Sequence, residues 1–451
     1  MKLVGRSILN LGRAIALPLA GLVLAAPAIA QYDNDNPFLE EIVVVAQKRE
    51  QNIMDVPVAI TAVTGAQIEA SGIKDVFDLQ QNVPGLIVGR SQTATTSNFS
   101  IRGIGSTSNN FGVESSVGLY VDGVYRSRQS SMINELIDVF SAEVLRGPQG
   151  TLFGKNTASG AINIRTVAPD ANTPNAFVEL TAGDLGLQRL SAAGNIRLSD
   201  NAAIRATVFS SQRDGYVDNY TYNLDPNEPP FIGVENDVFN NRDRWGARLQ
   251  LAYDNDDDFN LRLILDYAEI DEVCCAGISR IDSLFAQNAL LQGNVVNGSD
   301  AARSFFLLNT TFTDFPYEDI LGGPLPPTVI QGVTFEDYVT AQDILPVSQN
   351  EDQGISLEMN KSYDNGVTLT SVSAFRSFDT YDYIDVDFTV TGLAERYNDA
   401  SQHSFSQDLR FGVEFGERSN WVAGAYYFQQ TVKSNTRTTG GSDFPAYVNA
   451  V

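Results

Sequence analysis

Few residues in this chain have types and spacings that could carry catalysis or hold a metal ion. Its two cysteines, Cys274 and Cys275, are adjacent, and His403 is the single histidine. Neighbouring cysteines form a disulfide only with strain, so we expect both to be unpaired. A vicinal disulfide is the alternative in an oxidising compartment. His403 falls in a strand pattern and is expected to be a surface or lumen residue. These residues cannot form a zinc site, and the sequence contains no recognisable set of nucleophile, base and orienting group. We therefore predict neither a metal centre nor an enzyme.

Two glycine motifs resemble nucleotide-binding loops but lack a required residue. Gly103-Ile104-Gly105 lacks the third glycine of a dinucleotide loop. The segment from Gly150 to Lys155 has the wrong glycine spacing, and Asn156 stands where a phosphate loop needs Ser or Thr. We interpret both motifs as turns and expect no bound cofactor.

The stretch of residues 143–165, EVLRGPQGTLFGKNTASGAINIR, separates two kinds of sequence. Its glycines, set among short β-type runs, predict tight turns and close backbone approach rather than helix. The apolar and polar alternation of Ala161 to Arg165 predicts a strand. A small mixed domain precedes this stretch, and from about Phe177 onward long runs alternate strictly and are separated by loops of unequal length. The sequence therefore predicts a small α+β domain followed by a large all-β domain.

The first 30 residues have the pattern of a secretory signal: basic residues, an apolar run and the cleavage pattern Ala28-Ile29-Ala30. A membrane anchor is the alternative, but the run is short for a span. Removing residues 1–30 takes away Lys2, Arg6 and Arg13 and no acidic residue, so the net charge of −25 falls to −28. Such a charge would repel phosphates, which excludes nucleic acid as a partner.

Residues 31–50 are polar, acidic and contain Pro37, so we expect a flexible tail. Within it lies a β-branched run, Ile42, Val43, Val44, Val45 and Ala46. Such a run after a flexible leader is either the first strand of the next domain or a segment that pairs with the sheet edge of another protein. The residues alone favour neither alternative.

Residues 51–166 read as a small α+β domain. Thr64 is a possible N-cap of a short helix over residues 65–70, and residues 73–81 predict a second helix that ends before Pro84-Gly85. Asp122-Gly123 marks a hairpin turn. We place strands at residues 58–63, 86–89, 99–102, 117–121 and 139–145.

The large domain, residues 176–451, has strands with one apolar and one polar face. In one run Trp245, Leu249 and Tyr253 share a face, and Arg244 and Arg248 lie on the opposite face. This pattern is typical of a transmembrane β-barrel strand, and a soluble sandwich is the alternative. Strands of ten or more residues and arginines on the polar face favour the barrel.

Nine barrel strands are predicted, with short and long connections in alternation, as in an outer-membrane barrel. An odd number leaves an unpaired edge, so a barrel cannot close within these residues. We place the strands near residues 176–183, 187–198, 202–213, 243–254, 258–270, 353–363, 366–376, 403–415 and 419–430.

The small domain resembles the plug domain of TonB-dependent outer-membrane receptors. The resemblance rests on an ordered set of motifs: IVVVAQKRE (42–50), VPVAITAVTG (56–65), LQQNVPG (79–85), FSIRGIG (99–105), LYVDGVY (119–125), EVLRGPQGTLFG (143–154) and SGAINI (159–164). It implies a plug seated inside a barrel, and it identifies Ile42 to Ala46 as the TonB box, which pairs with the energy-coupling protein TonB. Similar receptors close with roughly 22 strands, so we expect this chain to be an N-terminal fragment.

The resemblance also implies a function, TonB-dependent uptake of a scarce ligand across the bacterial outer membrane. A ferric siderophore is the expected ligand, and an oligosaccharide or cobalamin is the alternative; the acidic composition favours a neutral or cationic cargo. Aromatic residues of the first long loop could form a ligand vestibule or anchor the barrel rim in outer-membrane lipid: Tyr216, Tyr220, Tyr222 and Phe231. A passive porin is the alternative of another class, but it needs neither plug nor TonB box.

A plug that must move on demand should be held by polar contacts. Arg102 and Arg146 lie in the two motifs most like those of the family. From strand parity, we predict that they form ion pairs with Glu358 and Asp408, which should face the lumen. The alternative is that both arginines only bind carbonyl groups of local turns.

Overall fold

The computed structural model describes residues 43–45, 48–49, 51–90, 92–106, 110–133, 135–222, 231–255, 257–276, 339–340, 342, 344–386, 394–415 and 419–441. The residues from Val43 onward form one compact unit. In these ranges, no helix is both long enough and apolar enough to cross a membrane.

The small domain is built on a five-stranded mixed sheet. Its order is β3 (Ile60–Thr64), β9 (Val139–Arg146), β10 (Gly160–Thr166), β7 (Val117–Val121) and β8 (Val124–Arg126). Strand β10 is central, parallel to β7 and antiparallel to β9. A second sheet contains β4 (Leu86–Arg90), β5 (Ser97–Ile101) and β6 (Ile104–Gly105). The two sheets share a core of aliphatic side chains and Phe99.

Local sequence signals account for several elements of the small domain. The predicted helix over residues 65–70 is α2 (Gly65–Ala70), and Thr64 and Gln67 form a capping box at its N-terminus. The predicted turn at Asp122-Gly123 joins β7 to β8, and both residues have positive φ, as a type I′ hairpin requires. Of the motif Gly103-Ile104-Gly105, which was interpreted as a turn, Gly103 lies in a turn and Ile104–Gly105 form β6.

The second predicted helix, over residues 73–81, is wrong. Only a 3-10 helix, η4 (Asp78–Gln81), forms there. The reason is that two aspartate side chains bind backbone amides that an α-helix would use: Asp78 accepts from the N–H of Lys74 at 2.9 Å, and Asp75 accepts from the N–H of Phe77 at 2.9 Å. Aspartate competes with the helix in this way at many turns.

The glycine-rich stretch contains the expected tight turns and one unexpected helical turn. Gly147 and Gly154 have φ of 101° and 81°. Residues Gly150–Phe153 form a single turn of helix, α3, where none was predicted. At Gly160 the backbone of β9 approaches so closely that a Cβ atom would lie 2.3 Å from the carbonyl oxygen of Leu145. The strand pairing of β9 and β10 therefore requires glycine at this position.

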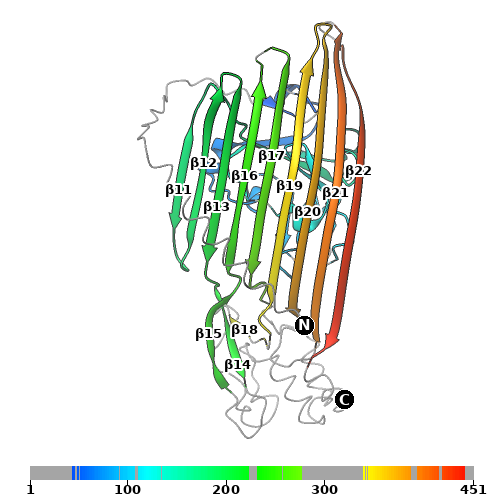
Figure 1. Cartoon of the computed structure of the whole chain (residues 1–451). Helices are drawn as coiled ribbons and strands as arrows, with labels where there is room; N and C mark the ends of the chain where they lie inside the picture. Colours follow the sequence, from blue (N-terminus) through cyan, green and yellow to red (C-terminus); the bar gives the residue numbers. More distant parts are fainter. Residues whose placement is uncertain are drawn as a thin grey trace. The chain divides into compact units, whose positions relative to one another are not determined.

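The nine predicted barrel strands are confirmed as one antiparallel sheet (Figure 1). In order they are β11 (Ala176–Ala182), β12 (Gln188–Ser199), β13 (Ala202–Arg213), β16 (Arg242–Asp254), β17 (Phe259–Glu272), β19 (Val347–Ser362), β20 (Val367–Asp385), β21 (Ala394–Phe415) and β22 (Ser419–Gly440).

Strands β20 and β21 are much longer than predicted. The residues between the predicted strands 366–376 and 403–415 are mostly strand, and the pairing continues as far as Asp385 and Glu395. A stacked pair of rings, Tyr383 and Tyr397 with centroids 4.5 Å apart, lies in this extension. Cross-strand aromatic pairs of this kind stabilise antiparallel ladders.

Short and long connections lie at opposite ends of the sheet, as predicted. The short connections are residues 200–201, 255–258, 363–366 and 416–418. The first long connection was predicted to be a loop, but it contains β14 (Val217–Tyr222) and β15 (Phe231–Phe239). These two strands pair with each other, and β14 also pairs with β18 (Val339–Thr340), at the lower end in Figure 1.

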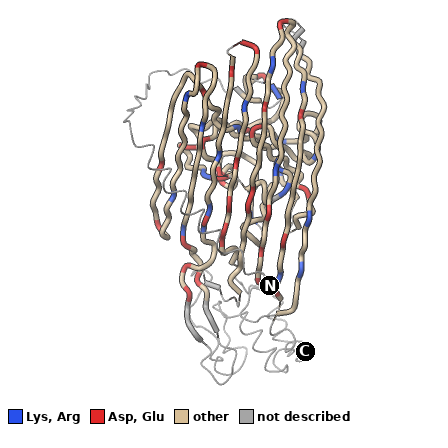
Figure 2. Tube along the Cα trace, viewed as in Figure 1, with Lys and Arg blue, Asp and Glu red and all other residues tan. Residues whose placement is uncertain are grey.

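The two faces of the sheet have opposite character. Leu249 is 46% exposed, whereas its neighbour Gln250 is fully buried and Arg244 is 2% exposed. The buried polar face contacts the small domain, and charged residues of both signs lie along its strands (Figure 2). The apolar side chains therefore face away from the small domain, which is the opposite of a soluble sandwich.

Replacing Gly160 with alanine should destabilise the small domain by about 1 to 3 kcal/mol, because the added methyl group overlaps the backbone of β9. Urea-dependent proteolysis of the purified protein measures this loss. Gly150→Ala is the matched control, because nothing lies within 4 Å of the Cβ position there. Equal stability of the two variants would contradict the close approach.

Candidate functional site

The β-branched tail run is docked on the same chain. Val43–Val44 forms β1, which pairs antiparallel with β2 (Gln51–Asn52), and Val44 is fully buried. The N–H of Val45 donates to Oε1 of Glu143 at 2.9 Å. The two outer residues of the predicted segment, Ile42 and Ala46, lie outside the described residues. The tail run is thus an added short strand in this structure, and pairing with another protein stays a prediction.

Glu143, on β9, is a buried carboxylate that sequence reasoning missed. It is fully buried, and besides the Val45 amide it accepts a hydrogen bond from Nδ2 of Asn163 at 3.3 Å. Burial raises the pKa of Glu143, although the hydrogen bonds from Val45 and Asn163 oppose this. The signal in the sequence is a lone acidic residue between apolar neighbours in a strand, Ala142 and Val144.

Lys48 fixes the turn that follows β1. Its ammonium Nζ lies 4.5 Å from the ring centroid of Phe153 and 5.2 Å from that of Tyr120. Asp408 of β21 is the ion-pair partner, with 3.8 Å between Nζ and Oδ2. Burial, with a smaller effect of Arg410, lowers the pKa of Lys48 to about 8, and Asp408 opposes the shift. The tail thus contacts both the small domain and the sheet.

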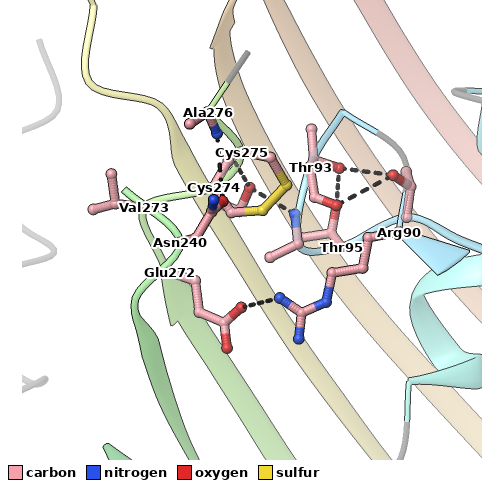
Figure 3. Close-up of a disulfide and its surroundings, with 12 residues drawn as sticks. Arg90, Thr93, Thr95, Asn240, Glu272, Val273, Cys274, Cys275 and Ala276 are labelled. Atoms are coloured by element: carbon pink, nitrogen blue, oxygen red, sulfur yellow. Dashed lines mark hydrogen bonds and ion pairs between the residues drawn. A yellow bond between two sulfur atoms is a disulfide. The ribbon is translucent and has the colours of Figure 1, made fainter. Parts of the chain in front are cut away.

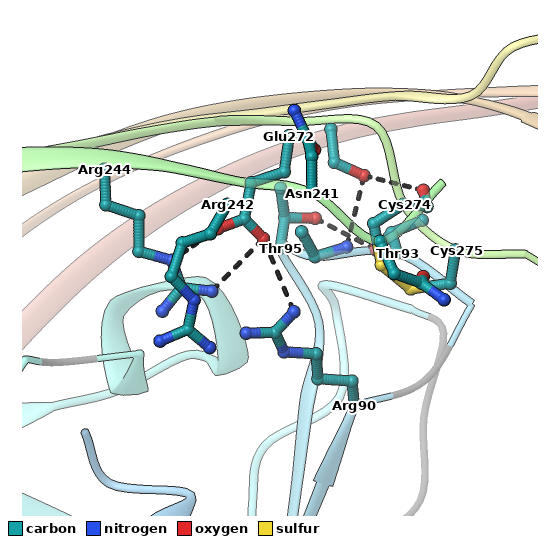
Figure 4. A network of polar contacts seen from close by, with 12 residues as sticks. Arg90, Thr93, Thr95, Asn241, Arg242, Arg244, Glu272, Cys274 and Cys275 are labelled. Carbon is teal, nitrogen blue, oxygen red and sulfur yellow. Dashed lines mark hydrogen bonds and ion pairs between the residues drawn. A yellow bond between two sulfur atoms is a disulfide. The ribbon is translucent and has the colours of Figure 1, made fainter. Parts of the chain in front are cut away.

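A first group of ion pairs joins two segments of the small domain, around Asp75 and Glu135, to strands β12 and β16. Glu135 lies 3.1 Å from Arg189 and 3.2 Å from Arg244, and Asp75 lies 3.3 Å from Arg242. Figure 4 shows Arg242 and Arg244 near Glu272 of β17, which pairs with Arg244 and with Arg90 of the small domain. Glu135 and Asp75 belong to the small domain, whereas Arg189, Arg242 and Arg244 belong to the sheet.

A second group lies between the loop before β9 and strands β13 and β16. Asp138 pairs with Arg205 at 2.6 Å and with Arg248 at 3.5 Å, and it accepts a hydrogen bond from Thr207 at 2.8 Å. Burial alone would raise the pKa of Asp138, but the hydrogen bond from Arg205 and the charge of Arg248 hold it below its ordinary value.

Asp122, in the β7–β8 turn, makes a similar contact to β17. It lies 3.3 Å from Arg262 and accepts hydrogen bonds from the amide and hydroxyl groups of Thr166. Burial opposes the effect, but Arg262 and Arg248 hold the pKa of Asp122 below its ordinary value. In other contacts the polarity is reversed, as where Arg126 of the small domain lies 3.5 Å from Asp266 and 3.3 Å from Asp352.

The predicted pairing of Arg102 and Arg146 with Glu358 and Asp408 is not what the structure contains. Arg102 is exposed and lies in a turn, where its backbone N–H donates to the carbonyl of Gly85. The backbone N–H of Arg146 donates to the carbonyl of Ala59. Glu358 accepts from Asn360, and Asp408 contacts Lys48 and Arg410. Strand parity predicts which face of the sheet a residue lies on. It does not predict which part of the small domain lies beside that residue, and this decides the ion-pair partner.

The prediction of unpaired cysteines is corrected, because Cys274 and Cys275 form a vicinal disulfide (Figure 3). The disulfide follows β17 at the end of the sheet that carries the long connections. Cys274 is buried against Ala94 and Ile133 of the small domain. Ser348 Oγ donates to the Cys274 carbonyl and accepts from the N–H of Ala94. The disulfide is therefore part of the contact between the two domains.

Further polar contacts of the small domain lie at the same end. Arg90 lies 3.4 Å from Glu272, and Thr95 donates to Asp382 at 2.6 Å. His403, on β21, is exposed beside Phe375, consistent with a surface position. Across the described part of the chain, no group of three or more His, Cys, Asp and Glu residues could hold a metal ion.

The predicted vestibule residues lie on or beside one hairpin. Tyr220 and Tyr222 are in β14, Phe231 opens β15, and Tyr222 and Phe231 are register partners. Tyr216 precedes β14 and is 41% exposed, with the guanidinium of Arg213 at 5.3 Å from its ring centroid. The structure brings these aromatic residues together at the long-connection end, and a role in ligand binding stays a prediction.

Comparison with known proteins gives consistent matches. Residues 52–161 match the family model of the TonB-dependent receptor plug domain. The pesticin receptor of Yersinia pestis is 36% identical over 172 residues, which is 38% of this chain and 25% of that receptor. The chain thus spans about a quarter of this curated relative.

Two solved structures share the fold. The ferric yersiniabactin uptake receptor FyuA from Yersinia pestis has a TM-score of 0.62 at 20% identity, over 85% of this chain and 50% of that receptor. The siderophore receptor PiuA from Acinetobacter baumannii has a TM-score of 0.64 at 15% identity, over 91% of this chain and 51% of that receptor. Both matches extend well beyond the small domain into the nine-stranded sheet.

Glu135→Gln should loosen the small domain from the sheet by about 3 to 5 kcal/mol, because it removes the buried anion that pairs with Arg189 and one of the anions around Arg244, which keeps Glu272. Urea-dependent release of the small domain to protease measures the change. Glu179→Gln is the matched control, since Glu179 pairs with Lys74 at a partly exposed site, where water can replace the lost contact. A Glu135→Gln protein as stable as the control would contradict the anchoring role.

Acid should weaken the same contact. The pKa values of Asp122 and Asp138 are lowered in the folded protein, so the released state takes up protons first as the pH falls below their ordinary value of 3.8. Their contribution is complete at neutral pH and is lost as the pH falls through the lowered values. Proteolytic release measured from pH 7 to pH 3 tests this, and Asp138→Asn should reduce the pH dependence. A release that is independent of pH would count against it.

Proposed function

We propose that this chain, which belongs to the TonB-dependent outer-membrane receptors, takes up a ferric siderophore across the bacterial outer membrane. Transport, and not catalysis, is the proposed activity. The observation that carries the proposal is the docked tail strand, because a passive channel has no use for a short detachable strand at the start of its interior domain.

Strand β1 is suited to leave β2 and pair with another protein. Among the described residues, strand β1 has two register pairs with β2, and one further hydrogen bond joins Val45 to Glu143. A short edge strand of this kind can pair with the sheet edge of another protein through main-chain hydrogen bonds. The proposed partner is TonB, which would bind Ile42 to Ala46 once β1 has left its place.

The polar contact between the small domain and the sheet supports a movable plug. Its ion pairs and hydrogen bonds can be exchanged for hydrogen bonds with water. An apolar interface would instead have to expose apolar surface to water when it separates. Pulling on the tail would transmit force to β2 and then to the small domain. A path for the ligand would open where the small domain yields.

The proposed ligand is a ferric chelate of low negative charge. Two structural relatives are, by their names, a ferric yersiniabactin receptor and a siderophore receptor, which supports the class. The strongly acidic composition disfavours polyanionic chelates. The aromatic residues of the β14–β15 hairpin are the proposed contacts, because aromatic side chains offer large, stiff surfaces to planar ligands.

Deletion of residues 42–46 should abolish uptake of radiolabelled iron supplied as a siderophore complex to iron-limited cells. Ligand binding to whole cells should persist, because the deleted segment lies away from the long connections. Cobalamin and oligosaccharide uptake by the same two strains are the comparison arms, and loss of either one in the deletion strain would name that cargo instead. Unchanged uptake of all three by the deletion strain would favour a passive channel.

A further inference from the structure

We propose that Lys48 is the positioning residue of the tail: it sets the register of β1 against the small domain, and its buried charge keeps the docked tail releasable. The inference rests on the proposed function, since releasing the tail has a purpose only if a partner takes it.

The position of Lys48 is defined by contacts on three sides. Tyr120 of β7 and Phe153 of α3 form one wall, with ring centroids 5.0 Å apart, and the Tyr120 hydroxyl donates to the Phe153 carbonyl at 2.5 Å. Asp408 of β21 lies opposite. The Lys48 carbonyl accepts from Nη1 of Arg410, and its N–H donates to the carbonyl of Val45. A slip of the tail by one residue would take the ammonium group out of this pocket.

The charge in this pocket is incompletely compensated. The Lys48 side chain is 9% exposed, and within the described residues its ammonium makes no hydrogen bond, although it has three donors. Its anion, Asp408, lies at 3.8 Å and is shared with Arg410, whose Nε is closer, at 3.3 Å. The two rings offer a cation–π attraction, which replaces only part of the lost hydration.

Docking therefore has opposing contributions that leave it reversible. The ladder with β2, the burial of Val44 and the Glu143 contact favour the docked tail, and the buried ammonium opposes it. An uncharged side chain of similar length would keep the aromatic contacts without the cost of desolvation. Such a substitution should hold the tail in place and hide it from a partner.

The pH dependence follows from the same balance. Besides Lys48, the ionisable groups in and around the pocket are Asp408, Arg410, Tyr120 and Tyr426 of β22. Burial raises the pKa of Tyr120, so it stays neutral. Lys48 has a pKa of about 8 when docked and 10.5 ordinarily, so between these values the released tail binds more protons and docking strengthens as the pH rises.

The test compares Lys48→Met with the unchanged receptor, purified in detergent. Hydrogen exchange of the peptide covering residues 43–52, corrected for intrinsic rates, reports docking, and binding of the periplasmic domain of TonB reports availability. We expect exchange to slow by about fivefold or more at pH 7, and TonB binding to weaken by a similar factor. Faster or unchanged exchange in Lys48→Met would overturn the proposal.

Two further variants separate charge from shape. Lys48→Arg keeps a charge that does not titrate, so its exchange should not slow between pH 7 and pH 9.5, whereas that of the unchanged receptor should. Lys74→Met, at an exposed lysine paired with Glu179, is the matched control and should leave residues 43–52 unaffected at both pH values. Slowing in Lys48→Arg, or an equal effect of Lys74→Met, would count against the proposal.

The outcome is separable from that of the proposed function. Exchange of residues 43–52 is read without transport, so uptake that survives deletion of residues 42–46 would remove the function and leave the docking result standing. Conversely, uptake lost in the deletion strain with unchanged exchange in Lys48→Met would remove only the role of Lys48. Heat modifiability of the barrel on gels shows that each variant is folded.

Discussion

The structure depends on buried ion pairs between the small domain and the polar face of the nine-stranded sheet. Most of them have one polarity: carboxylates of the small domain, such as Glu135 and Asp138, meet arginines of β12, β13 and β16. Removing either partner would leave an uncompensated buried charge, so the set fixes one seating of the domain. Because both surfaces are polar, water can replace their contacts, and this suits the movable plug of the proposed function.

The strands of the sheet could be predicted from the sequence, because alternation over ten or more residues is a local signal and the short turns between strands have few alternatives. The capping box at Thr64 and the turn at Asp122-Gly123 are local for the same reason. The helix predicted over residues 73–81, before Pro84-Gly85, was wrong because the side chains of two aspartates bind backbone amides there. The hairpin of β14 and β15 was missed because its polar residues read as a loop.

The candidate site could be predicted only in part. The β-branched tail run was visible, but its docking place was not, since the contact between Val45 and Glu143 joins residues 98 apart in sequence. The ion pairs show the same limit: parity placed Asp408 on the inner face, and its partner proved to be Lys48, not an arginine of a family-like motif. Partner choice depends on register between domains, which one sequence does not contain.

The lengths of the ladders have a mechanical consequence. Within the part of the tail that the structure describes, strand β1 is held to β2 by two register pairs, whereas β9 and β10 share seven. A pull on the leading end of a hairpin loads its bonds one after another, so β1 would peel away at low force while the inner sheet stays intact. The β1–β2 ladder, which is nearest the point where force is applied, should therefore separate first, and the longer β9–β10 ladder should separate last.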